Sequence, residues 1–438
     1  MAREQWRSRI GFIWAAVGSA IGLGSIWRFP YVVGANGGAA FILLYLICLI
    51  VVGFPVLMAE LTIGRRTALS PAGAFLTLGK NKGWELAGKT TIITGFLVST
   101  FYSVISGWTL AYLLEAIMGR LAHFHTAGEA LSHFKSVVGS PYLAVGMQGM
   151  FMLLAAWILY TGVRKGIERG NTIMMPLLLF VLVLLVAKGL SMPGASKGLQ
   201  FMFQVDWSLV TPGAIMIALG QAFFSLSLGQ GTMVTYGSYL SKDENLPMTC
   251  FPITLFGIII SLLSGIAIFS IVFSMGMEPT SGVSLMFETL PLIFSTLPGG
   301  HILSICFFLL LLLAALTSQI SALEPMIAYL IDKHLFKRHY AVILTCLVSF
   351  LIGIPSALSN ETLNSVMALC VDVLIPLGGL SAVILVGWRW GMKKALEHLK
   401  IDKNNYLSYY LHMSLKYLAP FLIIVIMLHG LGLMPYAT

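Results

Sequence analysis

Two glycine-rich stretches are the parts of this chain best suited to bind small charged ligands. Residues 18–28, GSAIGLGSIWR, and residues 225–231, SLSLGQG, each interrupt an apolar segment, and the four residues from Leu228 repeat the pattern of the four from Ile21. A helix that breaks inside a membrane exposes N–H groups at one end and carbonyl oxygens at the other. Those ends attract an anion and a cation. The pattern therefore predicts a site for a zwitterion such as an amino acid, together with a sodium ion.

The glycines have a plainer explanation, and Arg28 decides between the two. Small residues let helices pack closely in a membrane, which would account for Gly18, Gly22 and Gly24. Packing would not account for the arginine, because a charge within a membrane is costly unless it faces water or a partner. We therefore favour a binding site and expect Arg28 to form part of a gate.

The composition places this chain in a membrane. It has 438 residues, of which 58% are hydrophobic and only 10% are charged. Residues 29–59, 207–241 and 245–277 contain no Lys, Arg, Asp or Glu, and each is longer than the roughly 20 residues that span a bilayer. The net charge of +9 comes from residues in short loops, which is typical of membrane topology and argues against a nucleic-acid partner. The five cysteines lie in apolar segments, so no disulfide framework is predicted.

We predict an all-α integral membrane protein with eleven transmembrane helices. Most of the 26 Lys and Arg then lie on one side of the membrane. We therefore expect a multi-pass protein of the inner (plasma) membrane, with its N-terminus in the cytoplasm and its C-terminus on the outer side. Breaks in spans 1 and 6 predict a 5+5 inverted repeat, with residues 1–190 as the first repeat, 207–392 as the second, and 393–438 as a cytoplasmic loop and span 11. The spans are expected near residues 10–36, 39–64, 90–118, 142–161, 167–187, 212–240, 249–275, 300–332, 340–357, 362–390 and 407–430.

These motifs together resemble the neurotransmitter:sodium symporter family. The resemblance covers spans 1 to 10 and implies the fold of the bacterial leucine transporter, a sodium-coupled carrier that works by alternating access. Monoamine carriers of the family have an aspartate where this chain has Gly22, so glycine implies an amino-acid substrate, neutral and apolar. The matching stretches are GSAIGLGSIWRFPY at 18–31, NGGAAF at 36–41, GQAFFSLSLGQG at 220–231, LTSQISALEP at 316–325 and PLGG at 376–379.

The resemblance assigns the substrate-binding residues one by one. The substrate carboxylate should meet the N–H groups of Leu23 and Gly24 and the hydroxyl of Tyr102. The ammonium should meet carbonyl oxygens of four residues, which are Ala20, Phe224, Ser225 and Ser227. The side chain should lie among Gly22, Val98, Phe224, Ser227, Gln230, Ser318 and Ala322. Ordinary helix packing is an equally simple role for Val98, Phe224 and Ala322.

The resemblance also predicts one sodium site and weakens the case for two other ion sites. The expected site combines carbonyl and hydroxyl oxygens of Gly18, Ile21, Ala314, Thr317 and Ser318, although a buried Thr or Ser often only bonds a carbonyl one turn back. A first family sodium site normally uses two asparagines, and this chain has Ser25 and Gly257 in their places. Chloride binding is weakened too, because Gly257 removes one ligand while four others match, at Tyr45, Gln221, Ser225 and Ser261.

Gates are predicted at both ends of the transport path. Arg28 should close the outer end, with Asp372 within the membrane as a candidate partner. At the cytoplasmic end, Arg3 and Asp332 match the family's ion pair. The residues expected beside that pair are Trp6, Ser238 and Tyr239. Gly166 and Pro176 in span 5 predict a segment that opens to release the ion, or a static kink.

Other functions remain open on the sequence alone. A proton-coupled carrier of the same fold is one, and a channel or receptor is another. An enzyme is not expected, because the chain has no HExxH and no GxSxG motif. The histidines at 123, 125 and 133 are read as solvent-facing loop residues, with metal binding as the alternative. The oligomeric state and the preferred amino acid are not readable from the residues.

Overall fold

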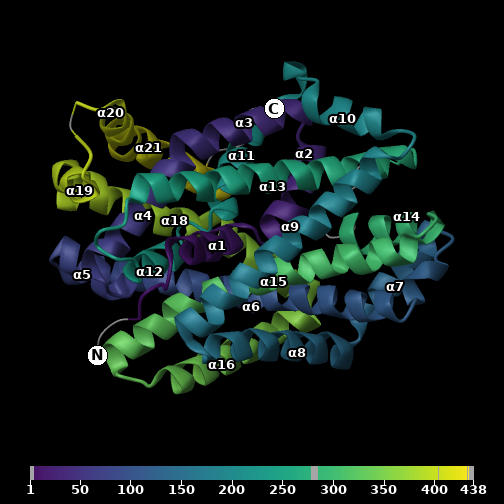
Figure 1. The fold of residues 1–438 in the computed structure, drawn as a ribbon, viewed down its shortest axis with the longest axis horizontal. Coiled ribbons are helices and arrows are strands. Elements are labelled where there is room, and N and C mark those ends of the chain that lie inside the picture. The colour runs from purple at the N-terminus through teal and green to yellow at the C-terminus, as the bar shows by residue number, and fades with distance from the viewer. Residues whose placement is uncertain (1–3, 278–284, 403, 432, 434–438) are drawn as a thin grey trace.

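The computed structural model describes residues 4–277, 285–402, 404–431 and 433, and every regular element among them is a helix (Figure 1). Seven π-helical segments interrupt or join the α-helices, among them Gly24–Arg28, Val163–Glu168 and Leu369–Leu374. The first ten α-helices are α1 (Arg9–Ala20), α2 (Phe29–Ala35), α3 (Ala39–Cys48), α4 (Phe54–Thr67), α5 (Pro71–Gly79), α6 (Lys82–Ile117), α7 (Ala127–Gly139), α8 (Pro141–Tyr160), α9 (Arg169–Leu190) and α10 (Ala195–Phe203). The others are α11 (Pro212–Ser225), α12 (Thr232–Ser238), α13 (Leu246–Ser274), α14 (Leu290–Thr296), α15 (Gly300–His334), α16 (Arg338–Leu358), α17 (Asn360–Ala368), α18 (Ile375–Ile384), α19 (Met392–Leu399), α20 (Tyr406–Met413) and α21 (Ala419–Gly430).

Membrane-spanning length is reached by nine helices of the described chain, or by ten if the bent pair Arg9–Ala20 and Gly24–Ala35 counts as one span. The span expected over 212–240 consists of two shorter helices, α11 and α12, and the irregular chain between them is the break predicted at 225–231. Eleven spans and the inverted repeat therefore remain predictions.

Helix α1 lies at the centre of the bundle, where it contacts α9, α13 and α15 (Figure 1). From Ala15 to Ala20 every side of this helix is buried. A helix that is apolar on all sides belongs in an interior, which is where the sequence places this one. Its central position puts the end of α1, at Ala20, in the middle of the protein.

Two long helices lie beside α1, and one of them, α15, contacts it directly. Helices α6 and α15 have 36 and 35 residues and pack against each other. In the most apolar window of α6, 89% of the residues are buried, against 33% in α8. Large apolar side chains such as Leu153 and Trp157 of α8 face outward. Such a surface suits lipid, because lipid-facing residues gain nothing from being polar.

Candidate functional site

The first break is shorter than the sequence suggested. Helix α1 ends at Ala20, residues 21 and 22 are irregular, and a π-helical turn begins at Gly24, with a bend of 52° between the two helices. Gly18 was expected within the break but lies in the last helical turn. Its role there is close packing, since a Cβ at Gly18 would lie 2.1 Å from the Oδ1 of Asn171.

Glycine is needed at position 22 because two hydroxyl groups approach the backbone. A Cβ on Gly22 would lie 2.2 Å from the Oγ of Ser318 and 2.7 Å from the hydroxyl oxygen of Tyr102. Contacts this short would displace both side chains. The absence of a side chain therefore brings hydroxyls from α15 and α6 up to the break in α1.

The second break joins α11 to α12 through residues in the left-handed conformation. Ser227, Gly229 and Gly231 have φ of 52°, 74° and 76°. Glycine adopts such angles without strain, whereas serine does so only at a cost. The Ser227 hydroxyl donates a hydrogen bond of 2.8 Å to the carbonyl of Ser19, so this strained residue ties the second break to the first.

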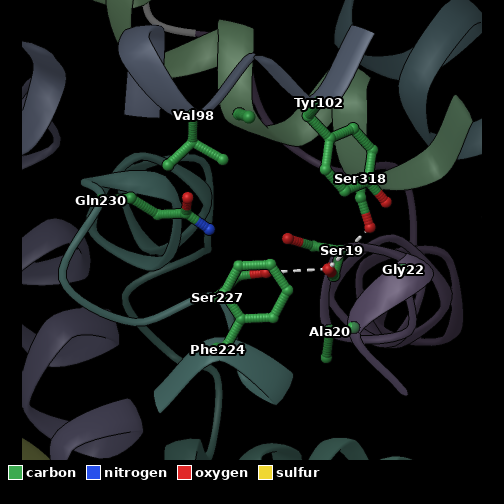
Figure 2. A pocket seen from close by; sticks show the side chains of 11 residues that line it. Ser19, Ala20, Gly22, Val98, Tyr102, Phe224, Ser227, Gln230 and Ser318 are labelled. Atoms are coloured by element: carbon green, nitrogen blue, oxygen red, sulfur yellow. Dashed lines mark hydrogen bonds between the residues drawn. The ribbon is translucent and has the colours of Figure 1, made fainter. Parts of the chain in front are cut away.

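A cavity of about 30 Å³ lies between the two breaks and is bounded by α6 and α15 (Figure 2). Ten of its lining residues were predicted as substrate contacts, namely Ala20, Gly22, Gly24, Val98, Tyr102, Phe224, Ser227, Gln230, Ser318 and Ala322. Ser19 also lines the cavity and was missed. Leu23 and Ser225 were assigned through their backbone atoms, and their side chains do not line it.

The polar groups around the cavity are backbone groups, hydroxyls and the side-chain amide of Gln230 (Figure 2). The N–H of Leu23 donates to the Tyr102 hydroxyl at 2.9 Å, so these two predicted carboxylate donors contact each other. The carbonyl of Ser19 accepts from Ser227 and, at 3.2 Å, from Ser318 (Figure 2). No Lys, Arg, His, Asp or Glu appears among the described residues of the lining. The arrangement offers partial charges of both signs without a full charge.

The predicted sodium ligands lie where α1 ends beside the middle of α15. The Thr317 hydroxyl donates to the carbonyl of Ala314 at 2.9 Å, which is the local bond that a purely structural threonine would make. A hydrogen bond of 2.8 Å between the Ser19 and Ser321 hydroxyls joins α1 to α15 nearby. The candidate donors are all oxygens, which suits a hard cation. The part of the chain that the structure describes has no group of three His, Cys, Asp or Glu that could hold a metal.

The residues predicted to weaken the other ion sites are placed as follows. The hydroxyl of Ser25 donates to the carbonyl of Ala20 at 3.2 Å. Around Gly257 there is open room, because a Cβ at this position would have a Leu226 methyl, 3.9 Å away, as its nearest neighbour. Two residues of the four that match the chloride pattern contact each other, since the Tyr45 and Ser225 hydroxyls are 3.0 Å apart. None of these contacts tests ion binding, so the weakening of the first sodium site and of the chloride site stays a prediction.

Arg28 contacts a neutral partner and not the predicted acid. Its Nη1 donates to the Oε1 of Gln221 at 2.5 Å, and its guanidinium lies 5.6 Å from the centre of the Phe224 ring. Within the described chain Arg28 and Asp372 form no ion pair, so a gate role for Asp372 stays a prediction. Asp372 instead packs beside Gly430, the last residue of α21. Gln221 also donates to the carbonyl of Gly24 at 2.9 Å, which fixes the amide that receives Arg28.

The opposite end of the site is closed by the segment that precedes α1. The Trp6 indole donates to the carbonyl of Tyr236 at 3.1 Å, and its ring centre lies 5.9 Å from that of Tyr239. Asp332 accepts a hydrogen bond of 2.6 Å from the N–H of Ser70. Arg3 lies outside the described residues, so its pairing with Asp332 stays a prediction.

A buried ion pair at this end was missed by the sequence reading. Arg338 binds both carboxylate oxygens of Glu324 at 2.8 Å, and the Tyr239 hydroxyl donates to the same carboxylate at 2.7 Å. Glu324 is fully buried. The sequence does indicate that Glu324 has a partner, because a lone acid within an apolar segment such as that of α15 is costly unless it is paired.

Two other buried acids were missed as well. Glu60 of α4 accepts from the N–H of Gly229 in the second break at 2.7 Å. Glu168, directly before α9, accepts from the N–H of Arg7 at 2.7 Å and from the N–H of Ser8 at 3.1 Å. The first holds the second break against α4, and the second ties the start of α1 to the start of α9.

Comparison with known proteins gives a consistent result over almost the whole chain. The sequence profile described as "Sodium:neurotransmitter symporter family" matches residues 3–134 and 136–437. An uncharacterized sodium-dependent transporter of Bacillus subtilis is 37% identical over 99% of this chain and 98% of its own length. Another from Methanocaldococcus jannaschii is 34% identical over 91% of this chain and 84% of its length. The crystal structure of MhsT in complex with L-phenylalanine has a TM-score of 0.91 and 41% identity, covering 98% of this chain and all of that one.

Proposed function

Because this chain belongs to the sodium:neurotransmitter symporter family, whose members are transporters, we propose that it imports a neutral, apolar L-amino acid together with sodium. Transport would proceed by alternating access to the cavity between the two breaks. The observation that carries the proposal is the lining of that cavity, which combines backbone ends of both polarities with no acidic or basic side chain among its described residues.

The proposed pose follows from the polar groups around the cavity. The carboxylate takes the place of the contact between Leu23 and Tyr102, so both donors turn to the substrate. The ammonium meets carbonyl oxygens at the ends of α1 and α11, among them that of Ala20. The apolar side chain lies between Val98 and Ala322, against the ring of Phe224. The phenylalanine bound by MhsT supports an apolar side chain.

One sodium ion is proposed, held by oxygens of Gly18, Ile21, Ala314, Thr317 and Ser318. Rotation of the Thr317 hydroxyl away from Ala314 would free two oxygens for the ion. Ser318 donates to the Ser19 carbonyl at the cavity wall, so the ion and the substrate would share one neighbour. This shared contact gives a physical basis for coupling, because each ligand would preorganise Ser318 for the other.

The membrane orientation is proposed from the charges. The N-terminus lies in the cytoplasm and the C-terminus outside, with the Arg28 end of the site facing outward. In this orientation the Glu324 and Arg338 pair lies at the cytoplasmic end.

Uptake into proteoliposomes across a panel of radiolabelled amino acids tests the proposal. We expect apolar amino acids to accumulate with an inward sodium gradient and not when choline replaces sodium. Gly22→Ala should abolish uptake, because its Cβ would displace Ser318 and Tyr102. Gly146→Ala is the matched control, since a Cβ at that helical glycine meets nothing within 4 Å. Accumulation that is unchanged in choline would overturn sodium coupling.

The charge moved per substrate tests the single ion. One sodium with a neutral amino acid carries one charge, and two sodium ions carry two. Two charges per substrate without proton exchange would refute the single-site proposal.

A proton-coupled carrier is the second candidate, and Glu60 is the observation that favours it. One oxygen of this buried carboxyl accepts from Gly229, and the other has no hydrogen-bond partner among the described residues. A proton on that oxygen would remove the cost of burying a negative charge that is not paired. Accumulation driven by a pH gradient alone, and lost in Glu60→Gln, would support this candidate over sodium coupling.

A further inference from the structure

Asn171 of α9 presents a buried oxygen that nothing in the described protein contacts by a hydrogen bond. The side chain is fully buried, and its Oδ1 has no hydrogen-bond partner among the residues that the structure describes. Its Nδ2 donates to the carbonyl of Ile167 at 2.8 Å. This bond fixes which end of the amide is which, because a flipped amide would place two oxygens against each other. The oxygen therefore faces the neighbouring helix.

The oxygen points at the last turn of α1, beside the proposed sodium site. A Cβ on Gly18 would lie 2.1 Å from Oδ1, so only a glycine lets the two helices meet in this way. Gly18 is also one of the residues whose carbonyl is proposed to hold sodium. Helices α1, α9 and α15 contact one another pairwise, and the two that supply the proposed ligands are α1 and α15. Asn171 thus approaches the site from its third side.

A buried amide oxygen without a donor needs a physical explanation. Burial without a partner costs roughly 1–3 kcal/mol, and an apolar residue of similar size would avoid that cost. The neighbouring Met174 and Met175 are also buried, but their side chains carry no amide oxygen that needs a donor. An amide oxygen is a good ligand for a hard cation, and here it faces Gly18, whose carbonyl is proposed for the same purpose.

We propose that Asn171 is an additional sodium ligand, supplied by α9 and held toward the site while the segment before α9 is closed. This inference rests on the proposed sodium coupling. The acceptor of its Nδ2, Ile167, belongs to the π-helical segment Val163–Glu168 that precedes α9. When that segment opens, the amide loses the bond that holds its oxygen toward Gly18, so the ion loses this ligand. Release of the ion and opening of the segment are coupled in this way.

The test measures sodium binding by the purified full-length protein, as the rise in melting temperature when sodium chloride replaces choline chloride. We expect Asn171→Leu to raise the half-saturating sodium concentration about tenfold, the loss of one good oxygen contact. Asn171→Asp retains an oxygen and should stay within about threefold of the parent. The matched control is Thr172→Ala, which removes a similar bond to the carbonyl one turn back, on the outer face of α9.

The outcomes separate this inference from the proposed function. If the parent shows no sodium-dependent shift, sodium coupling itself fails. If the parent responds and Asn171→Leu responds equally, or if the Leu and Asp variants are weakened alike, Asn171 is a structural residue and the inference is overturned. Asn171→Ala provides the same measurement should the leucine variant fail to fold, and substrate binding at saturating sodium verifies that each variant is folded.

Discussion

The two ends of the cavity are closed by very different amounts of structure. At one end, Arg28 reaches Gln221 through one hydrogen bond and lies over the ring of Phe224. At the other end, a whole segment before α1 is held by Trp6 and by the carboxylate of Glu168. The buried pair of Glu324 and Arg338 lies at this second end as well. We therefore predict that movements of a few side chains open the first, thin end, whereas the second, thick end opens only if backbone segments move.

The largest effect is expected from breaking the buried pair at the thick end. Arg338→Met should lower the free energy of unfolding by about 3–5 kcal/mol, because it leaves the fully buried Glu324 without its charged partner. Denaturant unfolding in detergent measures the change. The exposed Arg120→Met is the control and should leave stability unchanged. Removing both charges with Glu324→Leu and Arg338→Met should recover much of the loss, and failure to do so would contradict a pairwise role.

A smaller effect is expected at the thin end. Arg28→Ala removes a charged hydrogen bond, which is worth about 1.5–3 kcal/mol, and should shift the protein toward the state open at that end. A cysteine placed at Val98 on the cavity wall would report the shift, with alkylation about tenfold faster than in the Arg28 parent. Gln221→Leu removes the acceptor and should reproduce the result. Equal alkylation rates in all three proteins would mean that Arg28 does not close this end.

A local change in exchange is expected where the thick end opens. Gly166 lies in the π-helical segment before α9, and Pro176 lies inside α9, where it cannot donate a backbone hydrogen bond. Replacing sodium by choline should raise hydrogen exchange severalfold in residues 163–176, because the segment opens more often. Residues 98–110 of α6 serve as the internal reference. Identical exchange in both salts would leave a static kink as the explanation.

The smallest effect is expected from a surface contact at the same end. Lys333 and Glu85 form an ion pair of 2.5 Å in which the lysine side chain is 45% exposed. Water and salt screen such pairs, so they contribute little to stability. Lys333→Gln should leave the melting temperature and the uptake rate as they are. A clear loss in either would show that the thick end depends on its surface as well as on its buried pair.

The sequence was sufficient for the features that depend on local chain geometry. Glycine patterns predicted both breaks, and the family motifs around them predicted ten residues that line one cavity. Local patterns were less reliable on extent, since Gly18 is helical and packs against α9. The described chain has nine helices of spanning length and one bent pair, and the two helices of the second break are each too short to count alone.

The pairing of distant side chains could not be predicted in the same way. Asp372 was chosen for Arg28 by charge, whereas the structure supplies the neutral Gln221. Which residue meets Arg28 depends on how the helices are rotated, and a single sequence does not record rotation. Arg338 was counted only as a loop charge that sets topology, so its bond to Glu324 was missed. The free oxygen of Asn171 was hidden for the same reason.

The ring of Phe224 forms part of the cavity wall and also carries the guanidinium of Arg28 at 5.6 Å. The cavity measures only about 30 Å³, so a substrate side chain can enter only if the side chains of this wall move apart. A large side chain gains more contact but pushes the ring further, and the ring passes that displacement to Arg28. Across a series of amino acids of increasing size, we therefore expect the tightest binder and the fastest substrate to be different molecules.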